Sequence, residues 1–206
     1  MRIIGIDPGG TCGIVVLEEG KIASVFNIMS EQFWTNIQNL LDGQETAVVI
    51  EDIKPYSLRL TPQVIETCKW IGEAVYRLKN ASGVTVELVA RSEVKKWCFD
   101  AFPEVCVPMI EKKILKKIAK DGPESRLANK DTGEPRKPSF VFVDDQIVKE
   151  SMKFLFKIPP FKPGFGYKFG LKDHAWQALS VAAYWYHKDS GNEIKKGPDG
   201  PVMTLF

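Results

Sequence analysis

The first nine residues constrain the fold of this 206-residue chain more than any other segment. The run Arg2-Ile-Ile-Gly-Ile ends in the carboxylate of Asp7, and a Pro-Gly pair follows before a second apolar run, Cys12 to Leu17. Proline fixes φ and glycine permits positive φ, so the chain can reverse tightly at this point. Asp7 is therefore expected at the end of a buried strand, where a charge needs a neutralising partner. A metal ion is one such partner, and a plain Asp-Pro-Gly turn is the alternative.

Apolar patterning along the rest of the chain predicts an α/β layout with a mixed sheet covered by helices. The Glu19-Gly20 turn joins two strands of an antiparallel meander, and the unbroken apolar run before Glu51 is typical of a central parallel strand. Ser30, Pro62 and Ser92 are expected at helix starts. The expected strands are 2–7, 12–18, 21–28, 47–50 and 84–89, and the expected helices are 30–42, 61–80, 92–98, 110–120, 145–156 and 174–188.

A basic segment separates the expected last helix from the rest. Residues 112–172 carry 15 Lys and Arg against 7 Asp and Glu, although the whole chain has a net charge of only +2. Such a local excess indicates an anionic partner, whereas a solvated lysine-rich face is the alternative. We expect one domain, residues 1–188, with this basic insertion at about 100–171, and a loosely ordered tail at 189–206.

Composition indicates a protein of the cytoplasm. No apolar run approaches the ~20 residues that span a bilayer, and the N-terminus lacks a signal-peptide pattern. The four cysteines, at 12, 68, 98 and 106, form no CxxC pair and lie near no histidine at zinc spacing. Reduced and mostly buried thiols are therefore expected.

Oxygen ligands recur at two further places. Glu51 follows the expected central strand, so its carboxylate should emerge beside that of Asp7, and two such ligands suit Mg²⁺ or Mn²⁺. Asp173, His174 and Gln177 lie at the start of the last helix, within one turn of each other. The alternatives are a solvated strand end for Glu51, a helix cap for Asp173, a structural role for His174 and a surface amide for Gln177.

These motifs together resemble the RuvC-type Holliday junction resolvases of the RNase H-like superfamily, in a phage- or prophage-like variant. The resemblance rests on the segments IIGIDPGGTCGIVV, VVIEDIKPY, QVIETCKWIGEAVYRL, VELVARSEVKKW and KDHAWQALSVAAYWY. It covers residues 1–98 and 172–187 well and the stretch between them loosely. It implies an RNase H-like five-stranded mixed sheet flanked by helices, with the basic insertion before the last helix.

The resemblance also implies a function and a ligand set. Family members are metal-dependent endonucleases that cut branched DNA in recombination and repair, and they act as homodimers. By resemblance, Asp7 and Glu51 match two of the four side chains that bind two divalent ions, Mg²⁺ or Mn²⁺, and the long helix 61–80 is the expected dimer interface. His174 and Gln177 are the nearest matches to the other two, but the second is ordinarily Asp, and Asp173 is one residue out of register. The implied catalytic residues are Asp7, Glu51, His174 and Asp173.

The basic segment would then hold the phosphate backbone, giving affinity and salt dependence without sequence choice. The expected contacts are Lys112, Lys113, Lys116, Lys117, Lys120, Arg126, Lys130, Arg136 and Lys137. Aromatic residues between 161 and 169, interleaved with Lys162 and Lys168, are candidates for stacking on exposed bases, or else for packing on the core.

Two other functions compete with this interpretation. Gln177 in place of a carboxylate favours a weakened protein that binds structured nucleic acid without cutting it. The first strand of sugar-kinase and actin-like ATPases also ends in an Asp-x-Gly turn, but that fold needs a second phosphate-binding half for which 206 residues leave no room.

Overall fold

The computed structural model describes residues 1–53, 61–122, 125–129, 132, 134–158, 171–172 and 174–189. The aromatic segment between 161 and 169 and the tail beyond 189 lie outside the described residues, so the expectations for them stay predictions. Within the described ranges, no helix combines the length and apolar character that crossing a bilayer requires.

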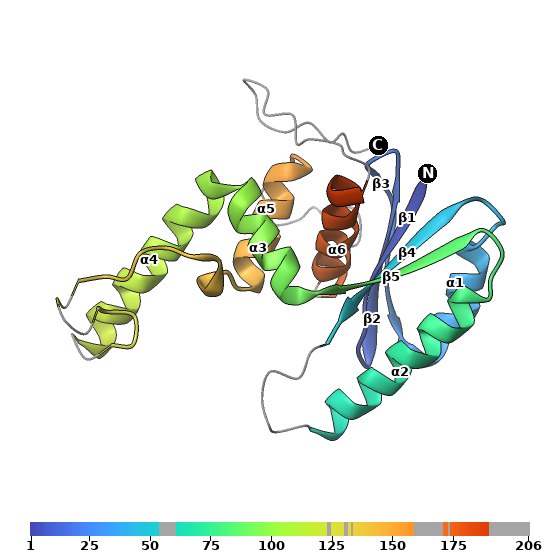
Figure 1. The fold of residues 1–206 in the computed structure, drawn as a ribbon, viewed down its shortest axis with the longest axis horizontal. Helices are drawn as coiled ribbons and strands as arrows, with labels where there is room; N and C mark the ends of the chain where they lie inside the picture. Colours follow the sequence, from blue (N-terminus) through green and yellow to red (C-terminus); the bar gives the residue numbers. More distant parts are fainter. Residues whose placement is uncertain are drawn as a thin grey trace, which may run out of the picture.

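Five strands form one mixed sheet in the order β3-β2-β1-β4-β5 (Figure 1). β1 is antiparallel to β2, and β2 to β3, whereas β1–β4 and β4–β5 are parallel pairs. This arrangement, with helices on both faces, confirms the predicted α/β fold class, a mixed five-stranded sheet flanked by helices. The strands are β1 Arg2–Asp7, β2 Thr11–Glu18, β3 Lys21–Met29, β4 Thr46–Asp52 and β5 Val84–Ala90.

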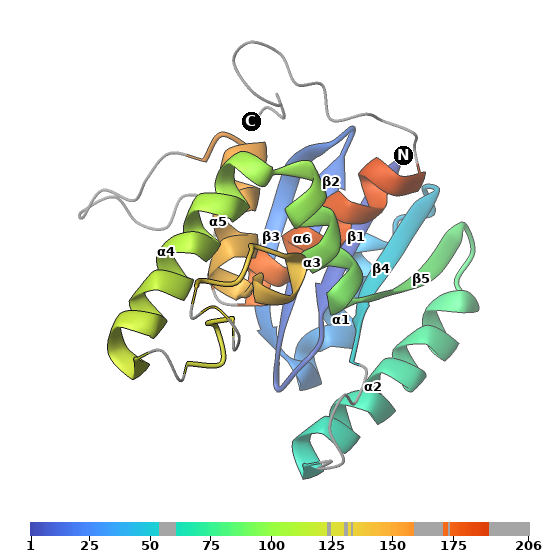
Figure 2. The ribbon, with the colours of Figure 1, turned by 60° about the vertical axis from the view of Figure 1, so that its left-hand side comes forward.

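The two faces of the sheet are buried by different helices. On one side, Ile4 and Ile6 of β1 pack in a cluster with α1 (Phe33–Leu40) and α2 (Pro62–Lys79). On the other, Ile3 belongs to a larger cluster that contains α6 (His174–Asp189) and the helices between β5 and α6 (Figure 2). Because alternate strand residues point to opposite faces, both clusters draw on the same strands.

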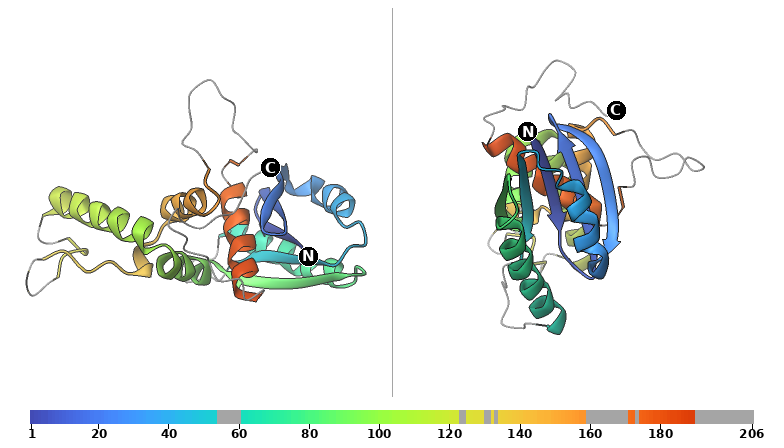
Figure 3. Two further views of the ribbon diagram at one scale, coloured as in Figure 1. Left: turned by 90° about the horizontal axis from the view of Figure 1, so that it is seen from above. Right: turned by 90° about the vertical axis from the view of Figure 1, so that its right-hand side faces the viewer.

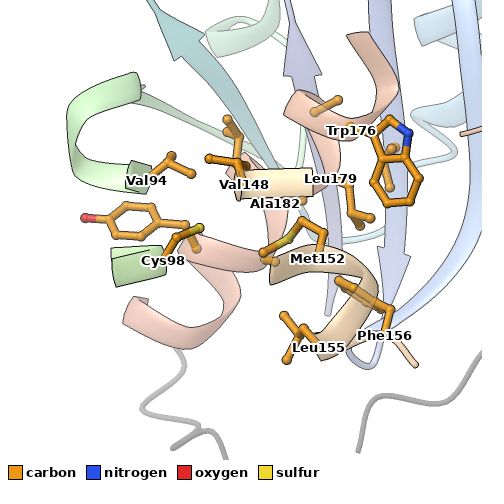
Figure 4. Packing of buried hydrophobic residues seen from close by; sticks show 14 of the residues in the cluster. Val94, Cys98, Val148, Met152, Leu155, Phe156, Trp176, Leu179 and Ala182 are labelled. Atoms are coloured by element: carbon orange, nitrogen blue, oxygen red, sulfur yellow. The ribbon is translucent and has the colours of Figure 1, made fainter. Parts of the chain in front are cut away.

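Three helices fill the space beside the sheet on the α6 side. α3 (Arg91–Ala101) follows β5 without a loop, α4 (Pro103–Asp121) follows α3, and α5 (Asp145–Leu155) comes after the short 3₁₀ helix Phe140–Phe142. Side chains of α3, α5 and α6 meet in one apolar core, which includes Cys98, Met152 and Leu179 (Figure 4). The basic insertion is thus packed into the main core through α5 and the first half of α4.

Helix boundaries differ from the sequence prediction in three places. Neither Ser30 nor Ser92 caps a helix: Ser30 begins a 3₁₀ turn, Ser30–Gln32, and Ser92 lies inside α3, where Glu93 Oε2 instead accepts a hydrogen bond from the Ala90 N–H at 2.9 Å. The lysine-rich helix begins at Pro103 rather than 110, because Cys106, Ile110 and Ile114 continue one buried stripe past Pro108. The predicted start at Pro62 is correct, with the Thr61 hydroxyl accepting from the Val64 N–H.

Most of the cysteine prediction is confirmed. All four thiols are free, and Cys12, Cys98 and Cys106 are buried, while Cys68 on α2 is exposed. The Cys106 sulfur lies 3.6 Å from the Ser151 hydroxyl, so it joins α4 to α5 inside the core.

Candidate metal centre

Asp7 and Glu51 lie side by side at the carboxyl edge of the sheet. β1 and β4 pair in parallel with Ile6 opposite Ile50, so the next residue of each strand is its carboxylate. Ile6 and Ile50 both face α1 and α2. Because the side-chain period of a strand is two, Asp7 and Glu51 both face α6. Both carboxylates are buried, with 7% and 3% of their residue surface exposed. The expected convergence of these two residues is confirmed.

Helix α6 reaches this edge because two glycines let it approach the sheet closely. A Cβ at Gly13 would lie 2.3 Å from the carbonyl carbon and oxygen of His174, and one at Gly5 would lie 2.2 Å from the Ala178 carbonyl oxygen. No residue with a side chain fits at either distance. The absence of a Cβ therefore sets the height of His174 above the sheet.

His174 contacts the carboxylate pair directly. Its Nδ1 lies 2.7 Å from Asp7 Oδ2, a hydrogen bond in which the ring N–H donates to the carboxylate. The imidazole is 43% exposed, whereas the Asp7 side chain is 9% exposed. A histidine bound in this way through one nitrogen keeps the other for a ligand or a proton.

Burial makes both carboxyl groups of the pair weaker acids than usual. Desolvation raises the pKa of Asp7, an effect that Glu51 and Arg91 oppose and Asp145 reinforces. Desolvation raises the pKa of Glu51 further, and the neighbouring charge of Asp7 adds to it. Two carboxylates this close cannot both ionise without a compensating positive charge.

The sequence analysis missed Arg91, which contacts Glu51, and Asp145, which contacts Arg91. Arg91 Nη1 lies 3.4 Å from Glu51 Oε1, and Arg91 Nη2 lies 2.7 Å from Oδ1 of Asp145, at the start of α5. Lys95, one turn along α3, lies 3.8 Å from the same Asp145 oxygen. The alternation of side chains along a strand could have pointed to Arg91. Glu51 pairs with Val89, and Arg91, two residues after Val89, is expected on the same face of the sheet.

The donor set fits a hard divalent cation. The buried Glu51 Oε2 has no hydrogen-bond partner, and the nearby Asp7 offers further oxygen, the ligand type that Mg²⁺ and Mn²⁺ prefer. Within the part of the chain that the structure describes, no three His, Cys, Asp or Glu side chains already stand together as a ligand group. Mg²⁺ is commonly held by one or two carboxylates together with water, which Asp7 and Glu51 would allow.

Of the two remaining predicted ligands, Gln177 and Asp173, the structure describes only the first. Gln177 lies half-buried on α6, one turn after His174. Asp173 lies outside the described residues. The roles of both as ligands stay predictions.

The basic residues lie away from the carboxylate pair, mostly on the half of α4 that extends from the sheet (Figure 3). Lys113, Lys116, Lys117, Lys120 and Arg126 line a groove of about 700 Å³, which we call the basic groove. Lys113 pairs with Asp144, and Lys117 with Asp121 at 2.9 Å. Lys112, Arg136 and Lys137 are exposed elsewhere on the insertion, and Lys130 lies outside the described residues.

Comparison with known proteins adds one structural likeness. No family model matches the chain, and no curated protein does. One solved structure that resembles it is that of Thermus thermophilus RuvC, with a TM-score of 0.49 and 14% sequence identity over 93% of this chain and 97% of that one. The case for a cation site consequently stands on the contacts of Asp7, Glu51 and His174 themselves.

Proposed function

We propose that this protein is a metal-dependent endonuclease that hydrolyses phosphodiester bonds in branched DNA, as Holliday junction resolvases do. The observation that carries the proposal is the buried Asp7–Glu51 pair with one unpartnered carboxylate oxygen. Each buried acid raises the cost of ionising the other, and a bound divalent cation would offset that cost.

Each candidate site residue has a separate role in this proposal. Asp7 and Glu51 hold the cation or the two cations, and Gln177 and Asp173 are the candidates for completing the ligand set. When bound, such ions activate water and stabilise the charge that develops on the leaving oxygen. His174 holds Asp7 in place through its Nδ1, and its other ring nitrogen is available to bind an ion or to move a proton.

The basic groove supplies affinity for the DNA backbone. It is exposed and lies on an element that extends from the sheet, so it can follow a phosphate chain without disturbing the core. Lysines used in this way recognise phosphate rather than base sequence. Selection of branched DNA would then come from shape and from pairing of two copies of the chain.

A homodimer is part of the proposal. A four-way junction has two equivalent strands to cut, and two-fold pairing is the commonest oligomer. Helix α2 is the proposed interface. Ile65 and Tyr76 are 42% and 72% exposed, and their separation of about three helical turns puts them on one face of α2.

The experiment is a nicking assay on a synthetic four-way junction with Mg²⁺ or Mn²⁺. We expect cleavage by the wild type and none by Asp7→Asn. Equal cleavage of junction and linear duplex would contradict the branched-DNA preference, and undiminished cleavage by both Asp7→Asn and Glu51→Gln would contradict the site.

A second function is favoured by Gln177, which offers a neutral amide where related nucleases carry a carboxylate. In that case the chain binds structured nucleic acid without cutting it. Tight junction binding by the wild type with no Mn²⁺-dependent nicking would support this second function over the first.

A further inference from the structure

Arg91 stands at the point where the sheet and the basic insertion meet. It is the first residue of α3, directly after β5, and a single guanidinium contacts Glu51 through Nη1 and Asp145 through Nη2. Because one guanidinium makes both contacts, the two carboxylates lie on either side of a single side chain. Arg91 thus connects a residue of the candidate cation site to the start of α5.

The two ends of this bridge differ in their freedom to move. The Glu51 side chain is 4% exposed, and neighbouring strands fix its position. The side chains of Arg91 and Asp145 are 39% and 58% exposed. The contact with Asp145, at 2.7 Å, is also closer than the 3.4 Å contact with Glu51. The shorter contact and the greater exposure favour a rearrangement in which Arg91 leaves Glu51 and stays with Asp145.

Electrostatics give Arg91 a role in the absence of a metal ion. A buried carboxylate without a nearby positive charge is costly, and Arg91 supplies that charge to Oε1 of Glu51 while Oε2 has no partner. A divalent cation bound to Glu51 would be repelled by the same guanidinium. Arg91 and the cation therefore compete for one carboxylate.

We propose that Arg91 is a resident counter-ion of Glu51 that gives way when a divalent cation binds, and that Asp145 is the anchor that receives the displaced guanidinium. This inference rests on the proposed cation site at Asp7 and Glu51. Arg91 and Asp145 are positioning residues, because they act through Glu51 and touch no reacting atom.

The proposal predicts opposite effects for the two partners. Arg91→Gln removes the competitor, so Mn²⁺ should bind about tenfold more tightly. Asp145→Asn removes the anchor, so Arg91 pairs with Glu51 alone and Mn²⁺ should bind more weakly. Because Asp145 acts through Arg91, the double variant should bind Mn²⁺ nearly as Arg91→Gln does, a non-additive result that a double-mutant cycle measures.

The experiment is calorimetric titration of Mn²⁺ into the metal-free full-length chain, at a pH at which Asp7 and Glu51 are both ionised, with thermal unfolding of the same samples. Arg77→Gln is the matched control, since Arg77 pairs with Glu73 on α2 and its loss changes the net charge equally. A second readout is stability: Arg91→Gln should lower the unfolding midpoint of the metal-free protein, and Mn²⁺ should raise it more than in the wild type. Should Arg91→Gln not fold, Arg91→Lys keeps the charge without the two-pronged contact and should bind Mn²⁺ no more tightly than the wild type.

The outcomes separate this inference from the proposed function. Tighter binding by Arg91→Gln with near-wild-type binding by Arg77→Gln supports the counter-ion role. Equal or weaker binding by Arg91→Gln, while the wild type still binds Mn²⁺ through Asp7, overturns it and leaves the cation site intact. An additive loss in the double variant overturns the anchor role of Asp145 and assigns it a direct one. No Mn²⁺ binding by the wild type or by Arg91→Gln overturns the inference and the cation site together.

Discussion

The carboxylate pair and the basic groove are both charged, yet they are built in opposite ways. Asp7 and Glu51 come from two strands, are almost fully buried and depend on the close approach of α6 at Gly13. The groove lysines come mainly from one helix, are exposed and depend on helical spacing alone. A charge in the first region is strongly coupled to its surroundings, whereas a charge in the second is screened by water and salt. Single substitutions should therefore have large effects at the pair and small, additive ones in the groove.

The largest expected effect is on cleavage when either member of the pair is neutralised. Asp7→Asn or Glu51→Gln should lower the rate of junction nicking by about a thousandfold or more, since each removes charge from the proposed cation site. Asp52→Asn is the matched control, because Asp52 is the next residue of β4 and faces the other side of the sheet. Equal losses in Asp52→Asn and Glu51→Gln would show that the strand, not the site, had been damaged.

The next largest effect concerns the helix that carries His174. Gly13→Ala places a Cβ 2.3 Å from the His174 backbone, so α6 must shift. We expect a loss of about 2 kcal/mol in the free energy of unfolding, as for other overpacked sites, together with slower nicking. Gly72→Ala, on α2 with open space around it, should instead be neutral or slightly stabilising. Urea unfolding measures both variants, and an unaffected Gly13→Ala would refute the tight α6 contact.

The pH dependence of stability gives a third test. In the metal-free protein the pKa of Asp7 is raised to about 6 and that of Glu51 to about 8, mainly by burial. A carboxyl whose pKa is higher in the folded than in the unfolded state binds extra protons when folded, so its contribution to stability is lost as pH rises through the folded pKa. The free energy of unfolding should consequently fall between about pH 4 and pH 8 through this pair.

Glu51→Gln isolates that contribution. The variant should be more stable than the wild type at pH 8 without metal, by about 2 kcal/mol, and the advantage should shrink toward pH 5. Urea unfolding at the two pH values in chelator provides the comparison. A constant difference between the proteins at both pH values would mean that the pair does not titrate in this range.

The smallest effects are expected in the basic groove. Lys116→Gln or Lys120→Gln should each weaken junction binding severalfold and reduce the slope of log K against log salt by about one. Lys21→Gln, at the edge of the sheet opposite Asp7, is the control for net charge. A groove lysine whose loss abolished binding outright would contradict the additive behaviour that distinguishes the groove from the pair.

Much of the sheet, and the Asp7 and Glu51 half of the site, could be predicted from local sequence patterns. The apolar runs before Asp7 and Glu51 predicted two strands, and their adjacency in the sheet brought the carboxylates together. Strand parity then set the face that each carboxylate occupies, which a sequence period of two encodes directly.

The other half depended on contacts between distant segments. Arg91 and Asp145 are 54 positions apart in the sequence and meet only because α5 packs beside α3. The early start of α4 was missed because Pro108 usually marks a helix end, whereas here a buried stripe outweighs the lost hydrogen bond. The predicted helix caps at Ser30 and Ser92 were wrong because no loop separates the preceding strand from the helical turn that follows it.

The most direct test of the central claim, that Asp7 and Glu51 share a divalent cation, is anomalous diffraction from crystals of the full-length chain grown with Mn²⁺. We predict an anomalous peak within coordination distance of both carboxylates, and its loss in Asp7→Asn crystals. Well-ordered density for Asp7 and Glu51 with no anomalous peak between them, at Mn²⁺ concentrations that support nicking, would contradict the account.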